Sequence, residues 1–148
     1  PIYRSFYLDK ILKKNNIIIK QNEEYKNLIE DINGRKTSQK NELPNGLNAS
    51  LREYQQVGYE WLKNLDHYEF GGILADDMGL GKTIQMLAVI LSYKENKGKE
   101  PNMVICPSSL ALNWQEESNR FTPELKTLVI SGNSEERINK IKVIKTKE

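Results

Sequence analysis

The spacing of apolar residues along this chain predicts a series of helices. In residues 54–65 apolar side chains recur three and four positions apart, the period that gathers them on one face of a helix. Further helices are expected over residues 3–14, 25–32, 82–93, 108–121 and 134–147. At the start of the 54–65 helix, Ser50 and Glu53 have the spacing of a capping box.

Short apolar runs separate the later helices and predict β-strands. These runs are residues 17–19, 71–75, 103–106 and 125–130. From Gly71 onward strand and helix alternate, which favours a parallel sheet with right-handed crossovers. The expected fold class is therefore α/β, with a parallel sheet flanked by helices.

A polar stretch divides the chain into parts of different character. Residues 34–48 are rich in Asn, Gly, Lys and Ser, and are expected to form a linker. Residues 1–33 before it predict a small α/β or mainly helical segment, the tail of an upstream domain, with no chemistry of its own. Residues 49–148 carry the alternating pattern and the candidate site.

Composition narrows the choice of function only a little. The 148 residues suffice for one ordinary core, and the formal net charge of +2 gives no electrostatic argument for nucleic acid. Cys106 is the single cysteine, so the sequence predicts neither a disulfide framework nor a metal cluster, and it favours a reducing, cytoplasmic setting. No apolar run approaches the length of a membrane helix. Because the chain begins at Pro1 and stops within a charged helical pattern, it is expected to be part of a longer protein.

The strongest chemical signal lies between the predicted strand 71–75 and the helix that follows. The pattern Gly-x-x-x-x-Gly-Lys-Thr is typical of a loop that holds nucleotide phosphates at a helix N-terminus, and Asp76 replaces its first glycine. Lys82 is expected to reach the β- and γ-phosphates and Thr83 to bind Mg²⁺. The predicted nucleotide-binding residues here are Asp76, Asp77, Met78, Gly79, Leu80, Gly81, Lys82 and Thr83. The alternative is that the glycines only make a tight turn.

Two carboxylates beside an anion site need an explanation. Asp76 and Asp77 would repel the phosphates unless something compensates for their charge. The possibilities are a bound Mg²⁺, a side chain that turns away from the site, or a helix-capping role.

Three stretches together indicate a family. LREYQQVGYEWL from Leu51, GGILADDMGLGKT from Gly71 and MVICPSSLALNWQEESNRF from Met103 resemble the Q motif, motif I and motif Ia of Swi/Snf-type ATPases. These enzymes form a branch of helicase superfamily two, and the chain looks most similar to its bacterial members. The resemblance implies the N-terminal part of a first RecA-like lobe, built on a phosphate-loop (P-loop) parallel sheet that would be incomplete here. An acidic residue at the position of Asp76 is common in the family.

The resemblance also implies ligands and roles. ATP and Mg²⁺ are the expected cofactors, with Gln55 reading the adenine edge, and double-stranded DNA is the expected partner of the whole protein. By the same resemblance the DNA backbone would be contacted by Pro107, Ser108, Ser109, Leu110 and Asn113. Judged without the resemblance, Gln55 is an ordinary solvated helix residue, and the two serines are as well explained by helix capping. Transcription or repair proteins are further expected partners, in the bacterial nucleoid.

The sequence also bears on catalysis. No Asp-Glu pair follows Ile130, and no second lobe is present to supply arginine fingers, so this chain alone is expected to be inactive although its parent hydrolyses ATP. Unpaired strand edges would make it prone to self-association. A non-catalytic nucleotide-binding or scaffold module, and a phosphate-loop kinase, are the alternatives.

Overall fold

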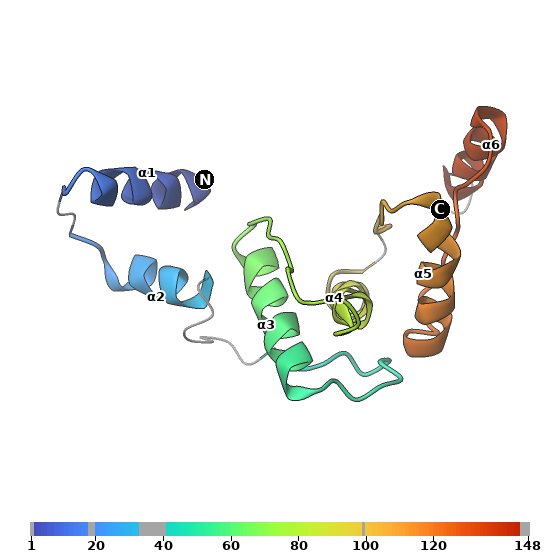
Figure 1. The fold of residues 1–148 in the computed structure, drawn as a ribbon, viewed down its shortest axis with the longest axis horizontal. Helices are drawn as coiled ribbons and strands as arrows, with labels where there is room; N and C mark the ends of the chain where they lie inside the picture. The colour runs from blue at the N-terminus through green and yellow to red at the C-terminus, as the bar shows by residue number, and fades with distance from the viewer. Residues whose placement is uncertain (1, 18–19, 33–40, 99, 146–148) are drawn as a thin grey trace. The chain divides into compact units, whose positions relative to one another are not determined.

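A computed structural model describes residues 2–17, 20–32, 41–98 and 100–145 of the chain (Figure 1). The described residues form the helices α1 (Ile2–Lys14), α2 (Glu23–Ile32), α3 (Glu53–His67), α4 (Lys82–Lys97), α5 (Ser108–Phe121) and α6 (Ser134–Lys145). Each lies where the sequence predicts a helix, so that part of the prediction is confirmed. None of them has the length and apolar content needed to cross a membrane.

The predicted sheet does not form among the described residues. Residues 71–75, 103–106 and 125–130 contain no strand, and residues 18–19 of the first expected strand lie outside the described part. A strand exists only when its backbone groups pair with a neighbour, and these segments have no such partner within the described ranges. The side chain of Ile73 accordingly remains 86% exposed. The prediction of a parallel sheet is therefore not confirmed in these residues.

The structure divides into two compact units. The first combines Pro1–Glu42 with Leu51–Gln85, and the second combines Leu43–Ser50 with Met86–Glu148. Helix α4 begins in the first unit, and its later turns belong to the second. Of the predicted linker, residues 34–40 lie outside the described part of the chain.

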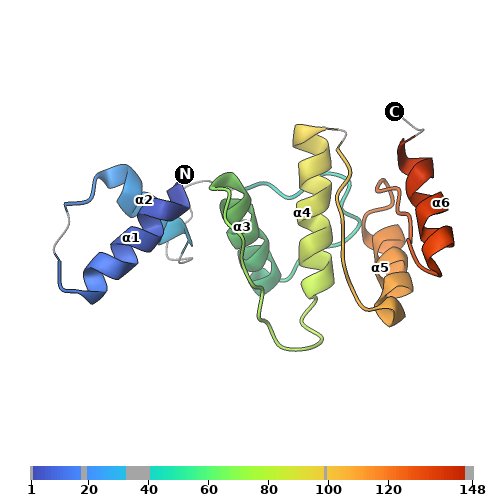
Figure 2. The same cartoon turned by 90° about the horizontal axis from the view of Figure 1, so that it is seen from above.

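The first unit is organised around α3. Tyr59 in this helix is completely buried, and its hydroxyl donates a 2.8 Å hydrogen bond to the carbonyl oxygen of Glu42. Helix α2 contacts α3 and contributes Leu28, which is also buried. Burying apolar side chains of this size contributes roughly 1.5–3 kcal/mol each. Figure 2 shows the chain leaving α3 through a long loop and entering the first turn of α4. The packing of Tyr59 and Leu28 therefore holds α3, the helix from which the loop departs.

The second unit is built on the later turns of α4. Leu87, Ala88 and Leu91 form an apolar buried stripe at helical spacing, as predicted for residues 84–93. The Glu95 carboxylate accepts hydrogen bonds from the amide nitrogens of Asn45 and Gly46, at 3.1 Å and 3.0 Å. Residues 43–50 are thereby attached to α4.

Candidate functional site

The loop that joins α3 to α4 carries the candidate site. Gly79 and Gly81 have positive φ angles of 83° and 79°, a conformation that costs other residues roughly 1–2 kcal/mol. Helix α4 begins directly after them, with Lys82 and Thr83 as its first two residues. The glycines are therefore required by the backbone path that leads the loop into the helix N-terminus.

The ammonium group of Lys82 bridges the loop. Its Nζ donates to the backbone carbonyl oxygens of Asp76 and Asp77, at 2.8 Å each. A lysine ammonium has three donors and no acceptor, so these carbonyls satisfy much of its hydrogen-bonding capacity. Lys82 thus lies across the loop, where the chain reverses toward α4.

Backbone donors at the start of α4 are available for an anion. Among the described residues, the amide nitrogens of Gly81, Lys82 and Thr83 donate to no protein acceptor. Unpaired first-turn amides carry the positive end of the helix dipole. A Cβ at Gly79 would meet nothing within 4 Å, so the loop is open there. These residues fit a bound phosphate group, with the Thr83 hydroxyl available to a cation.

Gln55 supports the loop from α3. Its Nε2 donates a 3.0 Å hydrogen bond to the Leu80 carbonyl oxygen, and its Oε1 accepts one of 2.9 Å from the amide nitrogen of Arg52. The side chain is 9% exposed, so the interpretation of Gln55 as a solvated glutamine is wrong. The capping prediction for Ser50 is also wrong, because α3 begins only at Glu53, after Arg52. Gln55 instead accepts the hydrogen bond at the helix start.

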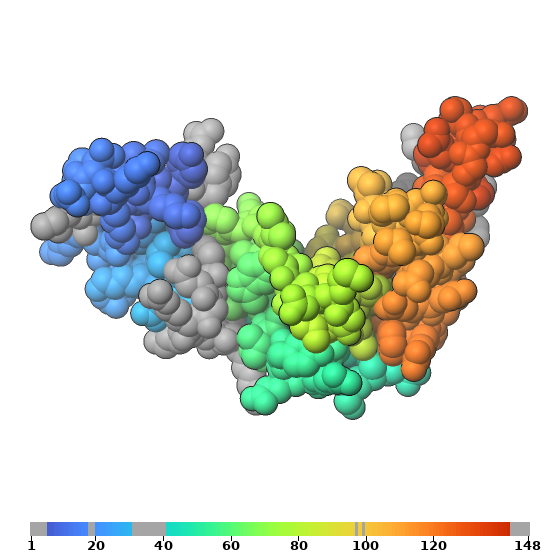
Figure 3. Space-filling view, viewed as in Figure 1, coloured from blue at the N-terminus to red at the C-terminus, as the bar shows by residue number. Residues whose placement is uncertain are grey.

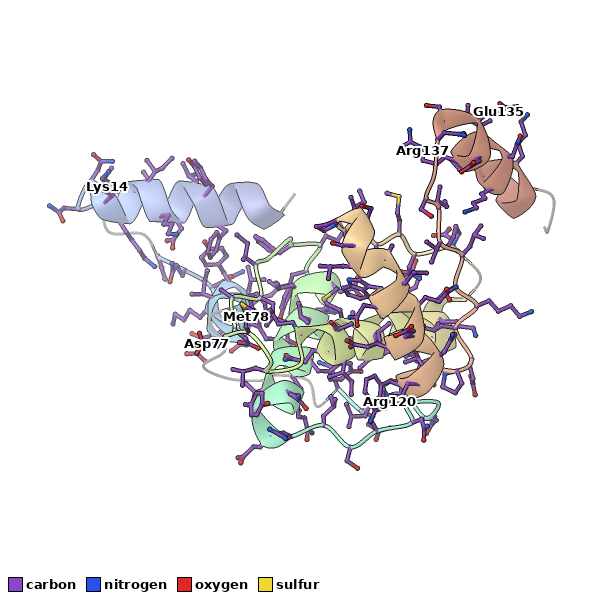
Figure 4. The ribbon with its side chains drawn as sticks, turned by 45° about the vertical axis from the view of Figure 1, so that its right-hand side comes forward. Lys14, Asp77, Met78, Arg120, Glu135 and Arg137 are labelled. Carbon is purple, nitrogen blue, oxygen red and sulfur yellow. The ribbon has the colours of Figure 1, made fainter. Side chains whose placement is uncertain are left out.

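The two loop aspartates differ in their surroundings. Asp77 is exposed, as is Met78 at 95%, and Figure 4 labels both side chains on the loop. The Asp76 carboxylate instead accepts a hydrogen bond of 3.2 Å from Nε2 of Gln85. In the space-filling view the lime-coloured atoms of the loop and of the first turn of α4 lie on the visible face (Figure 3). Of the three explanations for the acidic start of the loop, a side chain that turns away fits Asp76.

The residues expected to contact DNA lie at the start of α5, in the second unit. Pro107 precedes the helix, and Ser108 and Ser109 are its first two residues. Neither serine occupies the capping position, so the prediction that one of them caps this helix is wrong. Pro107, Ser108, Ser109, Leu110 and Asn113 are all exposed. The Asn113 amide donates to the Glu117 carboxylate at 3.0 Å.

Gln85 is the residue of the site that sequence reasoning missed. It is completely buried and follows Lys82 by three positions, on the helix face that meets the loop and α3. The available signal was its polarity within the otherwise apolar run 84–91, since buried polar side chains need hydrogen-bond partners. Its acceptor, Asp76, could not be found from spacing alone.

The loop geometry, with two left-handed glycines before a lysine at a helix N-terminus, is typical of phosphate-binding loop proteins. Residues 54–148 match the model of the SNF2-related domain. The chain therefore belongs to the SNF2-related domain family, within the Swi2/Snf2 ATPases of helicase superfamily two.

Similar proteins come from bacteria and from fungi. An uncharacterized ATP-dependent helicase of Mycoplasma pneumoniae is 48% identical over 90 residues, which cover 60% of this chain and 9% of that protein. Helicase swr1 of Schizosaccharomyces pombe is 46% identical over 102 residues, covering 67% and 8%. The TATA-binding protein-associated factor mot1 of the same yeast is 40% identical over 107 residues, covering 64% and 6%. The chain thus spans less than a tenth of each of these relatives.

A solved structure resembles the chain in three dimensions. It is the Sulfolobus solfataricus SWI2/SNF2 ATPase core in complex with double-stranded DNA. The TM-score is 0.62 at 40% sequence identity, and the match covers 68% of this chain and 21% of that one.

Proposed function

We propose that the chain binds ATP and Mg²⁺ through residues 76–83, and that the whole protein uses ATP hydrolysis to move along double-stranded DNA. The observation that carries the proposal is the placement of Lys82 across a glycine loop at the N-terminus of α4. Membership of the SNF2-related family and the ATP-dependent helicase of Mycoplasma pneumoniae support it.

The loop residues have distinct roles in this proposal. Lys82 exchanges its two carbonyl partners for phosphate oxygens, which bind an ammonium more strongly because they are charged. The amides of Gly79, Leu80 and Gly81 surround the β-phosphate, for which Leu80 gives up its 3.4 Å hydrogen bond to the Asp77 carbonyl oxygen, and the Thr83 hydroxyl binds Mg²⁺. Gln55 reads the adenine edge by exchanging its hydrogen bonds to Leu80 and Arg52 for bonds to the base.

The proposed DNA contacts are backbone contacts. Residues 107–110 and Asn113 are exposed at the N-terminus of α5, where amides and hydroxyls suit phosphate oxygens rather than base edges. The duplex DNA bound to the Sulfolobus ATPase core supports this choice of partner.

The place of the chain in a larger protein is also a proposal. We infer that residues 49–148 form the N-terminal part of a first RecA-like lobe. The whole protein would act in the cytoplasm, on DNA that carries transcription or repair proteins.

Calorimetric titration of the chain with Mg²⁺ and ADP tests the nucleotide site. Lys82→Ala should weaken binding by at least about tenfold, because charge-assisted hydrogen bonds to phosphate are lost. Lys126→Ala removes an exposed lysine outside the loop and serves as the control. Equal affinity of the Lys82→Ala variant and the unchanged chain would refute the phosphate assignment.

Removal of Mg²⁺ tests the role of Thr83. Chelation should weaken ADP binding to the unchanged chain, because the metal bridges the phosphates and the hydroxyl. In Thr83→Ala the same chelation should have little further effect. Titrations with and without EDTA measure this difference, and Thr83→Ser, which keeps the hydroxyl, should respond like the unchanged chain. A Thr83→Ala variant that remains fully Mg²⁺-dependent would contradict the assignment.

A further inference from the structure

Gln85 has a role in the loop that the nucleotide contacts do not include. Its side chain is 0% exposed, and its Nε2 lies 3.2 Å from Asp76 Oδ2 and 3.4 Å from the Gly81 carbonyl oxygen. One buried amide therefore reaches both the first acidic residue of the loop and its last glycine.

The orientation of this amide follows from its neighbours. Nitrogen faces two oxygens that can only accept, whereas the reversed amide would place its own oxygen against a carboxylate and a carbonyl. The remaining atom, Gln85 Oε1, is buried and has no hydrogen-bond partner among the described residues. A buried acceptor without a partner costs stability, so Gln85 is not explained by folding alone.

Helix α3 confines the same amide from the other side. A Cβ at Gly58 would overlap with Gln85 Oε1, so the helix can approach only because this residue is glycine. The amide consequently has little freedom to turn, and its donor stays directed at Asp76.

The hydrogen bond between Gln85 and Asp76 matters because the Asp76 carboxylate is negatively charged and lies beside the proposed phosphate site. Lys82 binds the backbone carbonyl of Asp76 and not its carboxylate, so the negative charge beside the loop is not neutralised by the lysine. Within the described residues Gln85 is the hydrogen-bond donor to that carboxylate. Because Gln85 is fully buried, the carboxylate oxygen bonded to it points into the protein.

We propose that Gln85 is a positioning residue for the nucleotide site. Its amide holds the Asp76 carboxylate against α4 and prevents it from turning toward the bound phosphates. This inference rests on the proposed nucleotide binding. In it, Gln85 is the residue that allows an acidic side chain to stand at the start of a phosphate-binding loop.

Calorimetric titration with Mg²⁺ and ADP tests the inference on the complete chain. Gln85→Met keeps the length of the side chain and removes the donor, and affinity should fall about tenfold, the equivalent of one hydrogen bond to a charged group. In the Asp76→Asn background the same change should alter affinity less than about twofold, because no charge remains to be restrained. Gln56→Met, at a half-buried glutamine of α3 whose amide donates to Glu60 and not to the loop, is the control for loss of a glutamine.

A purely structural role for Gln85 would give a different pattern. The Gln85→Met effect would then be the same in both backgrounds, and the thermal unfolding midpoint would fall with the affinity. We expect the midpoint to stay equal or rise, because methionine replaces a buried oxygen that lacks a partner. Gln85→Asn retains an amide that is too short to reach Asp76, and it should reproduce the loss of affinity if the methionine variant does not fold.

The outcomes separate this inference from the proposed function. No ADP binding by the unchanged chain would refute the nucleotide site and the role of Gln85 together. Two outcomes would overturn the inference alone while the unchanged chain binds ADP normally. One is equally tight binding by the Gln85 variants, and the other is a Gln85→Met effect that is undiminished in the Asp76→Asn background.

Discussion

At the scale of single residues, the two loop glycines have different reasons to be glycine. Both have positive φ angles, but a Cβ would meet nothing within 4 Å at Gly79, whereas at Gly81 it would overlap with Nε2 of Gln55. Gly79 is therefore needed for its backbone conformation only. Gly81 is needed for its backbone conformation and for its lack of a side chain.

Alanine substitutions at these glycines should show the difference. Gly79→Ala should lower the free energy of unfolding by about 1–2 kcal/mol, the cost of a left-handed alanine. Gly81→Ala should lower it further, because the new Cβ also displaces Gln55 from the Leu80 carbonyl. Urea unfolding of both variants measures the comparison. Equal losses would mean that Gln55 does not constrain the loop.

The sequence was sufficient to predict the residues whose arrangement depends only on their neighbours in the chain. The glycines and Lys82 are adjacent in the chain, and their order alone places an ammonium and a tight turn at a helix start. Gln85 was missed because its hydrogen bond to Asp76 spans nine positions and depends on the path of the loop. Gln55 was identified by family resemblance, but its bond to Leu80, 25 positions away, depends on how α3 packs.

At the scale of helices, the approach of α3 to the first turn of α4 depends on Gly58. Glycine within a helix normally costs roughly 0.5–1 kcal/mol relative to alanine, so Gly58→Ala would be expected to stabilise α3. Here the added Cβ would overlap with Gln85 Oε1. The usual gain should therefore disappear or reverse.

Two measurements on Gly58→Ala check this expectation. The thermal unfolding midpoint should not rise, and the affinity for ADP should fall as in Gln85→Met, because the displaced amide loses Asp76. His67→Ala, at the exposed C-terminal end of α3, is the control for an alanine added to this helix. A Gly58→Ala variant that is more stable and binds ADP normally would show that Gln85 has room to move.

Helices were predictable because their hydrogen bonds are made within each segment. Apolar spacing located α3, α4 and α5, and Ser or Pro marked the starts of α3 and α5, although the capping residues were wrong at both of these. A strand has no internal hydrogen bonds, so the apolar run 103–106 could only indicate a tendency. Whether that tendency is realised depends on a neighbouring segment.

At the scale of the whole molecule, several exposed apolar residues lie in the segments that were expected to form strands. Met103 and Ile105 are 82% and 85% exposed, and Leu128 is 49% exposed. Contiguous exposed apolar side chains favour association, particularly where backbone groups are unpaired. These segments are therefore expected to mediate contacts between copies of the chain.

Light scattering over a range of concentrations tests this prediction. The apparent mass of the unchanged chain should increase with concentration, and Ile105→Lys should reduce the increase by placing a charge in the exposed apolar segment. Ile138→Lys adds the same charge at a 52% exposed isoleucine in α6, outside these segments, and serves as the control. A constant monomer mass for the unchanged chain would contradict the prediction.

The sequence by itself determined the helices, the glycine turn and the lysine at the start of α4, because each depends on residues close together in the chain. The order of its three motifs also indicated the family to which the chain belongs. Only the tertiary structure decided that Asp76 turns to a buried glutamine, that Gly58 makes room for that glutamine, and that residues 71–75 stay unpaired. These features depend on contacts between distant segments, and side-chain spacing does not encode them.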